Sequence, residues 1–320
     1  MSMMKALVYD RTVQDWSTST GLIKRDVPVP ELDPTSSNVL VRVKYAGFCG
    51  SDRGIWYRKS FGDMISNSLD AEQRDVRISG HEFVGEIVAV GRRAALKYGY
   101  EVGQTVSTES HIVCGTCWQC RHNQEHVCVR DKIIGISQDG CFAEFLELPA
   151  KALWPTDLTR IRPEVAAVQE PFGNAVHACQ VSDLRGKRVA IFGTGTIGLF
   201  AVLIARGMGA SQVIGIEPNP IQQKLALQLG CDEVLSPQAN PDEPWAADRD
   251  LVEQLQRLTR GNGVDVAMEM SGVPSSLNSA IQATRRGGDV VLFGVRNGNA
   301  VIQDAHRIVM NGYDPDRRTP

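Results

Sequence analysis

The chain has 320 residues, 42% of them hydrophobic and 22% charged, with a formal net charge of −3 at pH 7. This composition excludes a disordered or fibrous protein, and the length suits two domains that each have a core. The charges show no long single-sign block, which favours neither a nucleic-acid nor a membrane partner. Residues 1–9 lead directly into a strand-like pattern without a signal peptide, so we expect a cytoplasmic protein.

Short β-rich runs, such as residues 39–43 and 83–90, fill the first 148 residues. Glycine, proline, aspartate and asparagine separate them, as expected for strands joined by turns. This pattern predicts a compact β domain over residues 1–165. Residues 58–77 are polar without a clear period, and we expect an insertion or loop there.

The pattern changes after residue 155, where apolar strands alternate with helical segments. The first strand covers residues 189–192 and the first helix about 196–207; further strands are expected at 213–216, 233–235, 264–269 and 290–294. Alternating strands and helices predict an α/β fold with a doubly wound parallel sheet over residues 166–313. Residues 237–247 should form a loop, and residues 314–320 a polar tail.

A glycine-rich loop follows the first of these strands and opens the helix after it. Its sequence is a GxGxxG motif, formed with Gly193, Gly195, Thr196, Ile197 and Gly198. Such a loop brings backbone amides to a pyrophosphate, and Glu217, at the end of the next strand, would bind ribose hydroxyls and repel a 2′-phosphate. The motif predicts NAD rather than NADP as cofactor. The alternative, a turn that binds nothing, is disfavoured by the register of strand, helix and acid.

Four closely spaced cysteines give the most specific signal in the sequence. They are Cys114, Cys117, Cys120 and Cys128. Four thiolates from one short segment fit a closed tetrahedral Zn2+ site, whose role is structural because no coordination position stays open. The alternatives are reactive thiols or an iron–sulfur site, although the latter expects a Cys-Pro at shorter spacing.

A second group is spread along the chain and combines different donors. It comprises Cys49, the adjacent pair His81 and Glu82, and Glu170. Thiolate, imidazole and carboxylate together are typical of a catalytic zinc site that leaves one position for water or substrate. On a regular strand His81 and Glu82 would point to opposite faces. Either the strand bends there, or one of the two contacts a metal ligand instead of the metal itself. Taken singly, Cys49 and His81 are better explained as core residues, and only the combination of donors favours a metal site.

These motifs together resemble the zinc-dependent medium-chain dehydrogenase family over about residues 5–312. The family joins a zinc-bearing β domain of chaperonin-10-like fold to a nicotinamide-binding Rossmann domain. Residues 110–115, 140–145, 170–177 and 269–274 are similar to the threonine dehydrogenase branch more than to sorbitol or classical alcohol dehydrogenases. The resemblance implies an enzyme that transfers a hydride from a secondary alcohol to NAD and holds one catalytic and one structural zinc ion.

The resemblance also implies roles for individual residues. Cys49, His81 and Glu82 take the positions of catalytic zinc ligands, and Glu170 that of a further ligand or a water-mediated carboxylate. Ser51 matches the hydroxyl that passes the substrate proton outward, and His111 matches a histidine near the substrate. Residues expected to face or line the nicotinamide groove are Asn174, Ser271, Gly272, Phe293 and Val295.

The sequence departs from the family pattern at two places. Asp52 is followed by Arg53 and Gly54, whereas many members carry a histidine there that completes a proton relay. The chain also stops where relatives continue with another strand, which usually pairs two subunits. A homo-oligomer is therefore in question, and an inactive NAD- and zinc-binding relative is one alternative. Another is a dehydrogenase of the same family acting on a polyol, sugar, butanediol or simple alcohol.

Overall fold

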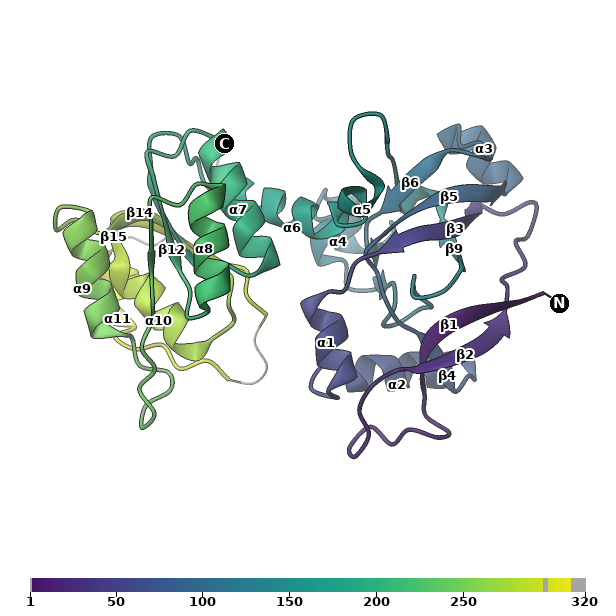
Figure 1. Cartoon of the computed structure of the whole chain (residues 1–320), viewed down its shortest axis with the longest axis horizontal. Coiled ribbons are helices and arrows are strands. Elements are labelled where there is room, and N and C mark those ends of the chain that lie inside the picture. The colour runs from purple at the N-terminus through teal and green to yellow at the C-terminus, as the bar shows by residue number, and fades with distance from the viewer. Residues whose placement is uncertain (1, 296–298, 312–320) are drawn as a thin grey trace. The chain divides into compact units, whose positions relative to one another are not determined.

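The computed structural model describes residues 2–295 and 299–311 of the chain. The chain divides into two compact units, Met1–Glu170 and Pro171–Pro320 (Figure 1). The tail predicted at 314–320 lies outside the described residues. No helix within the described part of the chain has the length and apolar character needed to cross a membrane.

The first unit is built mainly from β-strands. They form a three-stranded sheet in the order β2-β1-β4, a five-stranded sheet in the order β10-β6-β5-β3-β9, and the pair β7-β8. The strands are β1 (Met3–Asp10), β2 (Ile23–Pro28), β3 (Asn38–Ala46), β4 (Val76–Ile78), β5 (Phe83–Val90), β6 (Thr105–Thr108), β7 (His111–Ile112), β8 (Lys132–Ile133), β9 (Phe145–Pro149) and β10 (Leu153–Pro155).

Short helices and 3-10 turns connect these strands. They are α1 (Gly50–Trp56), α2 (Gly62–Glu72), α3 (Arg92–Tyr98), α4 (Trp118–Arg121), η1 (Glu125–Val127), η2 (Ala150–Ala152) and α5 (Pro163–Ala166); α6 (Gln169–Gln180) begins at the end of this unit. The main core forms from alternate residues of the central strands, because successive side chains of a strand point to opposite faces. Val39 and Val41 of β3 pack in this way with Phe83 and Ile87 of β5.

The segment predicted as a loop at residues 58–77 contains a helix and a strand, so that prediction was wrong. Helix α2 buries Ile65 and Leu69, which lie one helical turn apart, against Tyr9 and Ile55. Only two residues of the helix are buried among many polar ones, and so few do not make a visible helical period. The insertion is therefore part of the core of the first unit.

The second unit is a five-stranded parallel sheet in the order β13-β12-β11-β14-β15. Its elements are β11 (Arg188–Phe192), α7 (Thr196–Gly207), β12 (Gln212–Ile216), α8 (Pro220–Leu229), β13 (Glu233–Leu235), α9 (Arg249–Leu258), β14 (Val264–Glu269), α10 (Pro274–Ala283), β15 (Thr284–Leu292) and α11 (His306–Met310). This is the doubly wound order: β12 and β13 extend the sheet on one side of β11, and β14 and β15 extend it on the other. The predicted α/β fold is confirmed.

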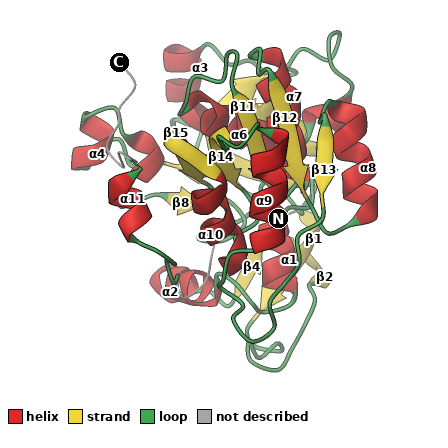
Figure 2. Cartoon of the chain, turned by 90° about the vertical axis from the view of Figure 1, so that its left-hand side faces the viewer, coloured by secondary structure: helices red, strands yellow, loops and turns green. Residues whose placement is uncertain are grey.

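Helices cover both faces of this sheet (Figure 2). Val189 and Ile191 of β11 pack with residues of α7 and α8, whereas Ala190 and Phe192 pack with α9 and α10. Since both faces of β11 are buried, the strand is an unbroken apolar run, which is how the sequence revealed it. The last strand starts earlier than predicted, because β15 follows α10 directly at Thr284.

Candidate metal and dinucleotide sites

The first unit brings three of the four predicted catalytic donors together. One ligand atom each of Cys49, His81 and Glu82 lies within 4.8 Å of the other two. Cys49 sits at the start of α1, whereas His81 and Glu82 come just before β5 and are almost completely buried. The three donors converge from segments that are about 30 residues apart in the sequence, and thiolate, imidazole and carboxylate suit Zn2+.

The backbone before β5 explains how two adjacent residues face one site. Gly80 has φ +90°, a conformation that favours glycine, and the strand begins only at Phe83. His81 and Glu82 therefore precede the regular strand, and the alternation of a strand does not apply to them. The carboxylate of Glu82 lies against Gly47, where an added Cβ would overlap its Oε2 atom. Sequence reasoning did not single out Gly47, because its importance comes from this contact with a residue far along the chain.

Two neighbours of Cys49 contact the imidazole of His81. Asp52 lies with Oδ1 3.8 Å from His81 Nδ1, while its Oδ2 accepts a hydrogen bond of 2.9 Å from the backbone N–H of Cys49. Ser51 Oγ lies 3.3 Å from the other ring nitrogen, Nε2. Asp52 thus caps the start of α1 and lies beside the imidazole, where neither atom of the 3.8 Å pair has a hydrogen-bond partner among the described residues.

The electrostatics of this cluster favour a cation. Burial raises the pKa of Asp52 and of Glu82, because the charged forms lose hydration. Burial also lowers the pKa of His81, but the hydrogen bond to Cys49 and the nearby acidic groups raise it to about 9. An excess of anionic groups around one imidazole is the environment that a divalent metal ion neutralises. The donor set and its charge therefore fit zinc.

Glu170, the fourth predicted donor, lies outside this trio. It is buried in the first turn of α6, and its Oε1 atom accepts a hydrogen bond of 2.7 Å from Ser110 Oγ. Its charge contributes to raising the pKa of Asp52, His81 and Glu82, after burial and the nearer partners of each group. The structure thus separates three donors in mutual contact from one carboxylate that Ser110 holds.

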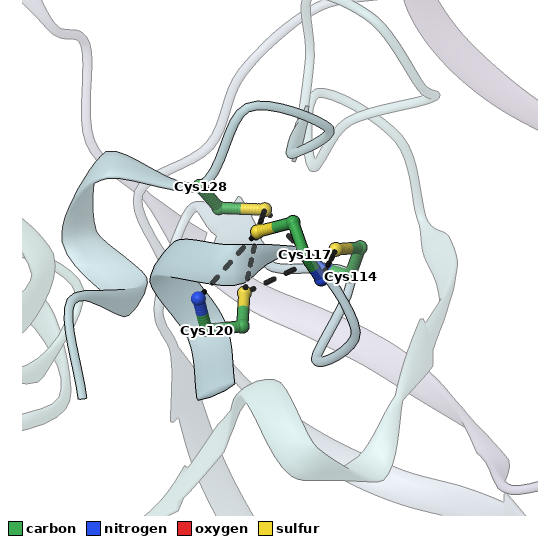
Figure 3. A group of neighbouring side chains, drawn as sticks. All are labelled: Cys114, Cys117, Cys120 and Cys128. Carbon is green, nitrogen blue, oxygen red and sulfur yellow. Dashed lines mark hydrogen bonds between the residues drawn. The ribbon is translucent and has the colours of Figure 1, made fainter. Parts of the chain in front are cut away.

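The four cysteines of the other predicted metal site converge in one lobe. Their sulfur atoms point toward one another from the turn at Cys114, the start of α4 and the end of η1 (Figure 3). Cys117 Sγ lies 3.4 Å from Cys120 Sγ and 3.8 Å from Cys128 Sγ, and all four sulfurs lie within 4.8 Å of one another. Four sulfurs at such spacings match a closed tetrahedral zinc site.

Backbone amides in the lobe stabilise thiolates. Thr116 and Cys117 donate N–H groups to Cys114 Sγ at 3.4 and 3.3 Å, and these bonds lower the pKa of Cys114 to about 5. Cys120 donates its N–H to Cys117 Sγ at 3.5 Å, and the pKa of Cys117 is lowered too. Burial, by contrast, raises the pKa of Cys120 to about 12. Because the thiolate is the form that binds metal, the backbone favours metal binding at Cys114 and Cys117.

In the second unit the glycine-rich loop lies at the carboxyl end of β11, beside the end of β14. Gly193 has φ +93°, and a Cβ there would lie 2.8 Å from that of Ser271. A Cβ on Gly198 would overlap the carbonyl oxygen of Gly193, so only glycine lets the helix start this close to the strand. Around Gly195, by contrast, an added Cβ would meet no atom within 4 Å. The open space lies where dinucleotides bind in sheets of this order.

Glu217 stands at the end of β12 and connects to the same loop. Its Oε2 atom accepts a hydrogen bond of 3.0 Å from the backbone N–H of Thr194, and Oε1 accepts one of 3.0 Å from the backbone N–H of Asn219. Each carboxylate oxygen has further lone-pair capacity for a ligand hydroxyl. Glu217 is therefore fixed beside the loop in an orientation suited to a ribose.

The remaining predicted groove residues lie on two touching loops after β14 and β15. Gly272 has φ +68°, and a Cβ there would overlap the carbonyl oxygen of Val295. Phe293 donates its backbone N–H to the carbonyl of Glu269 at 2.9 Å. Glu269, which sequence reasoning did not select, also accepts hydrogen bonds from the backbones of Ser271 and Gly272, both at 3.0 Å. Its buried carboxylate shapes the loop that contacts Gly193.

Two other predicted residues lie apart from the metal trio in the described contacts. His111 begins β7 with a half-exposed side chain, and its Nδ1 atom lies 2.6 Å from Asp131 Oδ2. Asn174 lies within α6. The pairing of His111 with Asp131 carried no sequence signal, because the two residues are brought together by the ladder between β7 and β8.

Comparison with known proteins places both units in known families. Residues 35–158 match the alcohol dehydrogenase GroES-like domain, and residues 196–313 match the zinc-binding dehydrogenase family. An L-threonine 3-dehydrogenase from Pyrococcus horikoshii is 37% identical over 288 residues, which cover 90% of this chain and 76% of that protein.

Solved structures of related dehydrogenases have the same fold. A zinc-binding dehydrogenase from Sinorhizobium meliloti 1021 bound to NADP has a TM-score of 0.79 and 29% identity, and the match covers 98% of this chain and 83% of the other. The 2R,3R-butanediol dehydrogenase from Bacillus subtilis has a TM-score of 0.78 and 27% identity, with 97% and 82% covered. Each match extends over both units of the chain.

Proposed function

This chain belongs to the zinc-dependent medium-chain dehydrogenase family, and from that membership we propose that it oxidises L-threonine at its secondary hydroxyl group with NAD. The carbinol carbon loses a hydride to the nicotinamide, the hydroxyl loses a proton, and the product is 2-amino-3-ketobutyrate. The observation that carries the proposal is the convergence of Cys49, His81 and Glu82 in a chain that is 37% identical to a threonine dehydrogenase.

The trio would hold the catalytic zinc ion. When bound there, zinc supplies the positive charge that lowers the pKa of an alcohol beside it, so that the hydroxyl ionises near neutral pH. Asp52 holds the backbone N–H of Cys49 by a hydrogen bond and places a carboxylate oxygen 3.8 Å from the imidazole of His81. Gly47 leaves the room that the carboxylate of Glu82 occupies. These neighbours keep the donors in one arrangement before any metal arrives.

Ser51 is placed to move the proton of the substrate hydroxyl. Its Oγ atom lies 3.3 Å from His81 Nε2, at the metal trio, and a serine hydroxyl both accepts and donates hydrogen bonds. Beyond Ser51, the position two residues after Asp52, which many family members fill with histidine, holds Gly54. We therefore propose that the proton leaves from Ser51 directly to water.

His111 is our candidate for contact with the substrate outside the metal trio. Asp131 engages Nδ1 of its imidazole, which fixes the ring and the tautomer and leaves Nε2 directed elsewhere. The side chain of His111 is 47% exposed, so a ligand can reach this second nitrogen. A half-exposed imidazole oriented by a carboxylate is suited to bind a polar substrate group.

The dinucleotide is proposed to bind at the Gly193–Gly198 loop with its ribose hydroxyls at Glu217. Gly193, Gly195, Thr196, Ile197 and Gly198 would surround the pyrophosphate, and Asn174, Ser271, Gly272, Phe293 and Val295 would line the nicotinamide groove. NAD supplies the acceptor for the hydride. The negative charge of Glu217 opposes a 2′-phosphate, so we propose NAD even though the S. meliloti relative holds NADP.

The cysteines and the edge of the parallel sheet bear on where the protein works and whether it forms oligomers. None of the eight cysteines, all of which the structure describes, forms a disulfide, which suits the reducing cytoplasm. Within the described residues, β15 is the last strand on one side of its sheet. An unpaired strand invites pairing with a second copy, so a homo-oligomer formed at β15 is compatible with the structure.

The test is NADH formation by the zinc-loaded protein with L-threonine, compared with 2,3-butanediol, sorbitol, glucose and ethanol. We expect L-threonine to give the highest kcat/KM and NADP to replace NAD poorly. A preference for 2,3-butanediol would replace L-threonine as the proposed substrate and leave the proposed hydride transfer to NAD unchanged. No turnover with any of them, despite two bound zinc ions per chain, would contradict the proposed activity.

A further inference from the structure

Arg77, on β4, is the largest fully buried side chain of the described residues, and the proposed mechanism does not use it. Its guanidinium donates hydrogen bonds of 2.8 Å to Glu72 Oε2 and 3.2 Å to Asp139 Oδ1, and one of 3.1 Å to Ser68 Oγ. A buried charge is tolerated only with such partners, and removal of one of them is strongly destabilising. Arg77 therefore ties the end of α2 and the segment at Asp139 firmly to β4.

Asp139 connects the buried guanidinium to the main chain. Its Oδ1 atom, which accepts from Arg77, also accepts a hydrogen bond of 3.1 Å from the backbone N–H of Ile78. Its Oδ2 atom lies 2.8 Å from a guanidinium nitrogen of Arg74, nearer the surface. One carboxylate thus bonds to two arginines and to the backbone of β4, and charge-assisted bonds of this kind fix its position.

The residues that follow Asp139 run beside the backbone that leads to the metal trio. Three N–H groups of residues 140–142 donate to the three carbonyl oxygens of residues 78–80, each at 2.9 Å. The packing is close, because a Cβ added to Gly140 would overlap the carbonyl oxygen of Gly80. The sulfur of Cys141 lies 3.4 Å from the carbonyl oxygen of Glu82. Segment 139–142 therefore contacts the backbone immediately before and after His81.

This contact matters because two of the metal donors lie outside a regular strand. β4 ends at Ile78 and β5 begins at Phe83, so the strand ladders stop on either side of residues 79–82. The turn at Gly80, with φ +90°, sends both His81 and Glu82 toward the third donor. A shift of this turn would move both donors at once, and metal affinity depends on how ligands are oriented.

We propose that Arg77 and Asp139 are positioning residues, whose buried ion pair fixes the turn at Gly80 and so holds two donors of the catalytic zinc site in place. The inference rests on the proposed function, because it requires zinc at the metal trio. The pair acts through segment 139–142 rather than on the zinc ion. Without the pair, the segment is free to shift along β4, and the donors must be reordered when zinc binds. The catalytic site then holds zinc more weakly, while the cysteine lobe keeps its ion.

The experiment measures how tightly the whole protein holds Zn2+ in competition with a chelator. Cys49→Ser identifies the catalytic ion, and the lobe ion serves as an internal reference. Asp139→Ala removes the bonds to Arg77 and to Ile78, and we expect the affinity for the catalytic ion to fall by about tenfold or more, as for other residues behind metal ligands. Asp139→Asn keeps an acceptor for the N–H of Ile78 and should lose less. Wild-type affinity in a folded Asp139→Ala would overturn the inference.

Cobalt(II) in place of zinc reports the geometry of the site as well as its affinity. The visible bands of Co2+ depend on the arrangement of its ligands, and the difference between wild type and Cys49→Ser isolates the catalytic ion. We expect these bands to shift in Asp139→Asn, because the donors are no longer held at the same places. If Asp139→Ala does not fold, unchanged bands and unchanged affinity in Asp139→Asn would still contradict the inference.

Asp10→Asn is the matched control for the loss of a buried ion pair. Asp10 lies on β1 in the same sheet, has 1% of its surface exposed, and pairs with Arg25 of β2. Since it is more deeply buried than Asp139, its substitution should lower the unfolding temperature at least as much, yet leave the affinity for catalytic zinc unchanged. An equal loss of zinc affinity in Asp10→Asn would show that affinity follows stability, which contradicts the inference.

A double variant tests whether Arg77 acts through Asp139. Arg77→Lys keeps the charge but loses the planar fork that bonds to two carboxylates, so it should weaken zinc binding by itself. Added to Asp139→Ala, it should weaken binding no further, whereas additive losses would contradict a shared role. If wild type and Cys49→Ser bind the same number of zinc ions, the proposed function fails; if they differ and Asp139→Ala matches wild type, only this inference fails.

Discussion

The two proposed metal sites of the first unit are assembled in opposite ways. The cysteine lobe takes its four donors from residues 114–128, a single segment with one turn of α-helix. The trio of Cys49, His81 and Glu82 takes its donors from the ends of separate elements that the fold brings together. One site organises its own segment, whereas the other depends on the structure around it.

This difference determines what each metal ion contributes. Where the donors are close in sequence and little else is buried, metal binding supplies the free energy that orders the segment. The three buried lobe residues, Cys117, Cys120 and Cys128, form a cluster of their own with little apolar support. The catalytic trio is held by neighbours that are already fixed in the core, so its zinc ion should add reactivity more than stability.

Cys49→Ser is the change with the largest expected effect. A hydroxyl binds zinc far more weakly than a thiolate, so the catalytic ion should be lost, and kcat/KM should fall by about 1,000-fold or more. Circular dichroism and thermal unfolding should stay close to wild type, since the surrounding core is unchanged. The zinc content should fall from two ions to one per chain.

If Cys49→Ser unfolds the first unit, the proposed difference in stability between the two sites is wrong. That outcome would mean that the catalytic ion is as structural as the lobe ion. Cys231→Ala provides the matched control, because Cys231 is a buried cysteine of the second unit and belongs to neither metal group. It should keep both zinc ions and most of the activity.

Gly47→Ala should have the next largest effect and tests how rigidly the trio is held. An added methyl group would overlap the Glu82 carboxylate, which must then move from its place beside Cys49 and His81. We expect the affinity for catalytic zinc to fall by about 10- to 100-fold, as when a group that orients a ligand is lost. Competition with a chelator measures this. Wild-type affinity would show that Glu82 is not needed as a donor.

The two sites also differ in how far the sequence predicts them. Four cysteines within one segment specify a metal site by spacing alone, whereas Cys49 and His81 indicate one only in combination with carboxylates elsewhere in the chain. Gly47 could not be selected from the sequence, because its importance depends on a contact with Glu82 that no local pattern encodes. Contacts between distant segments are what sequence periodicity does not contain.

For the fold, too, local patterns were predictable and contacts between distant segments were not. The parallel sheet of the second unit was predictable, since its strands are mostly continuous apolar runs followed by helices. Helix α2 was missed, because it buries only Ile65 and Leu69 and is otherwise mostly polar. Its residues look like a loop until Tyr9 and Ile55, which arrive from other elements, provide the surface that it covers.

Cys120→Ser tests the cysteine lobe and should lower activity less than Cys49→Ser does. The lobe should lose its zinc ion, and residues 113–130 should exchange their amide hydrogens faster, while the rest of the first unit stays protected. We expect kcat/KM to fall by about tenfold, because Ser110 and His111 stand at the base of the lobe. Loss of the catalytic zinc ion as well would contradict the independence of the sites.

Asp131→Asn should have the smallest effect on activity, because Asp131 contacts His111 and none of the proposed zinc ligands in the described contacts. The amide would keep the size of the side chain but lose the charge that holds His111 Nδ1 at 2.6 Å. An exposed pair of this kind contributes little, about 0.2–1 kcal/mol, which corresponds to a fall in kcat/KM of up to about fivefold. If Asp131 acts through the imidazole, the same substitution in a His111→Gln background should change nothing further. A full additional loss in that background would show that Asp131 supports the lobe itself rather than orienting His111.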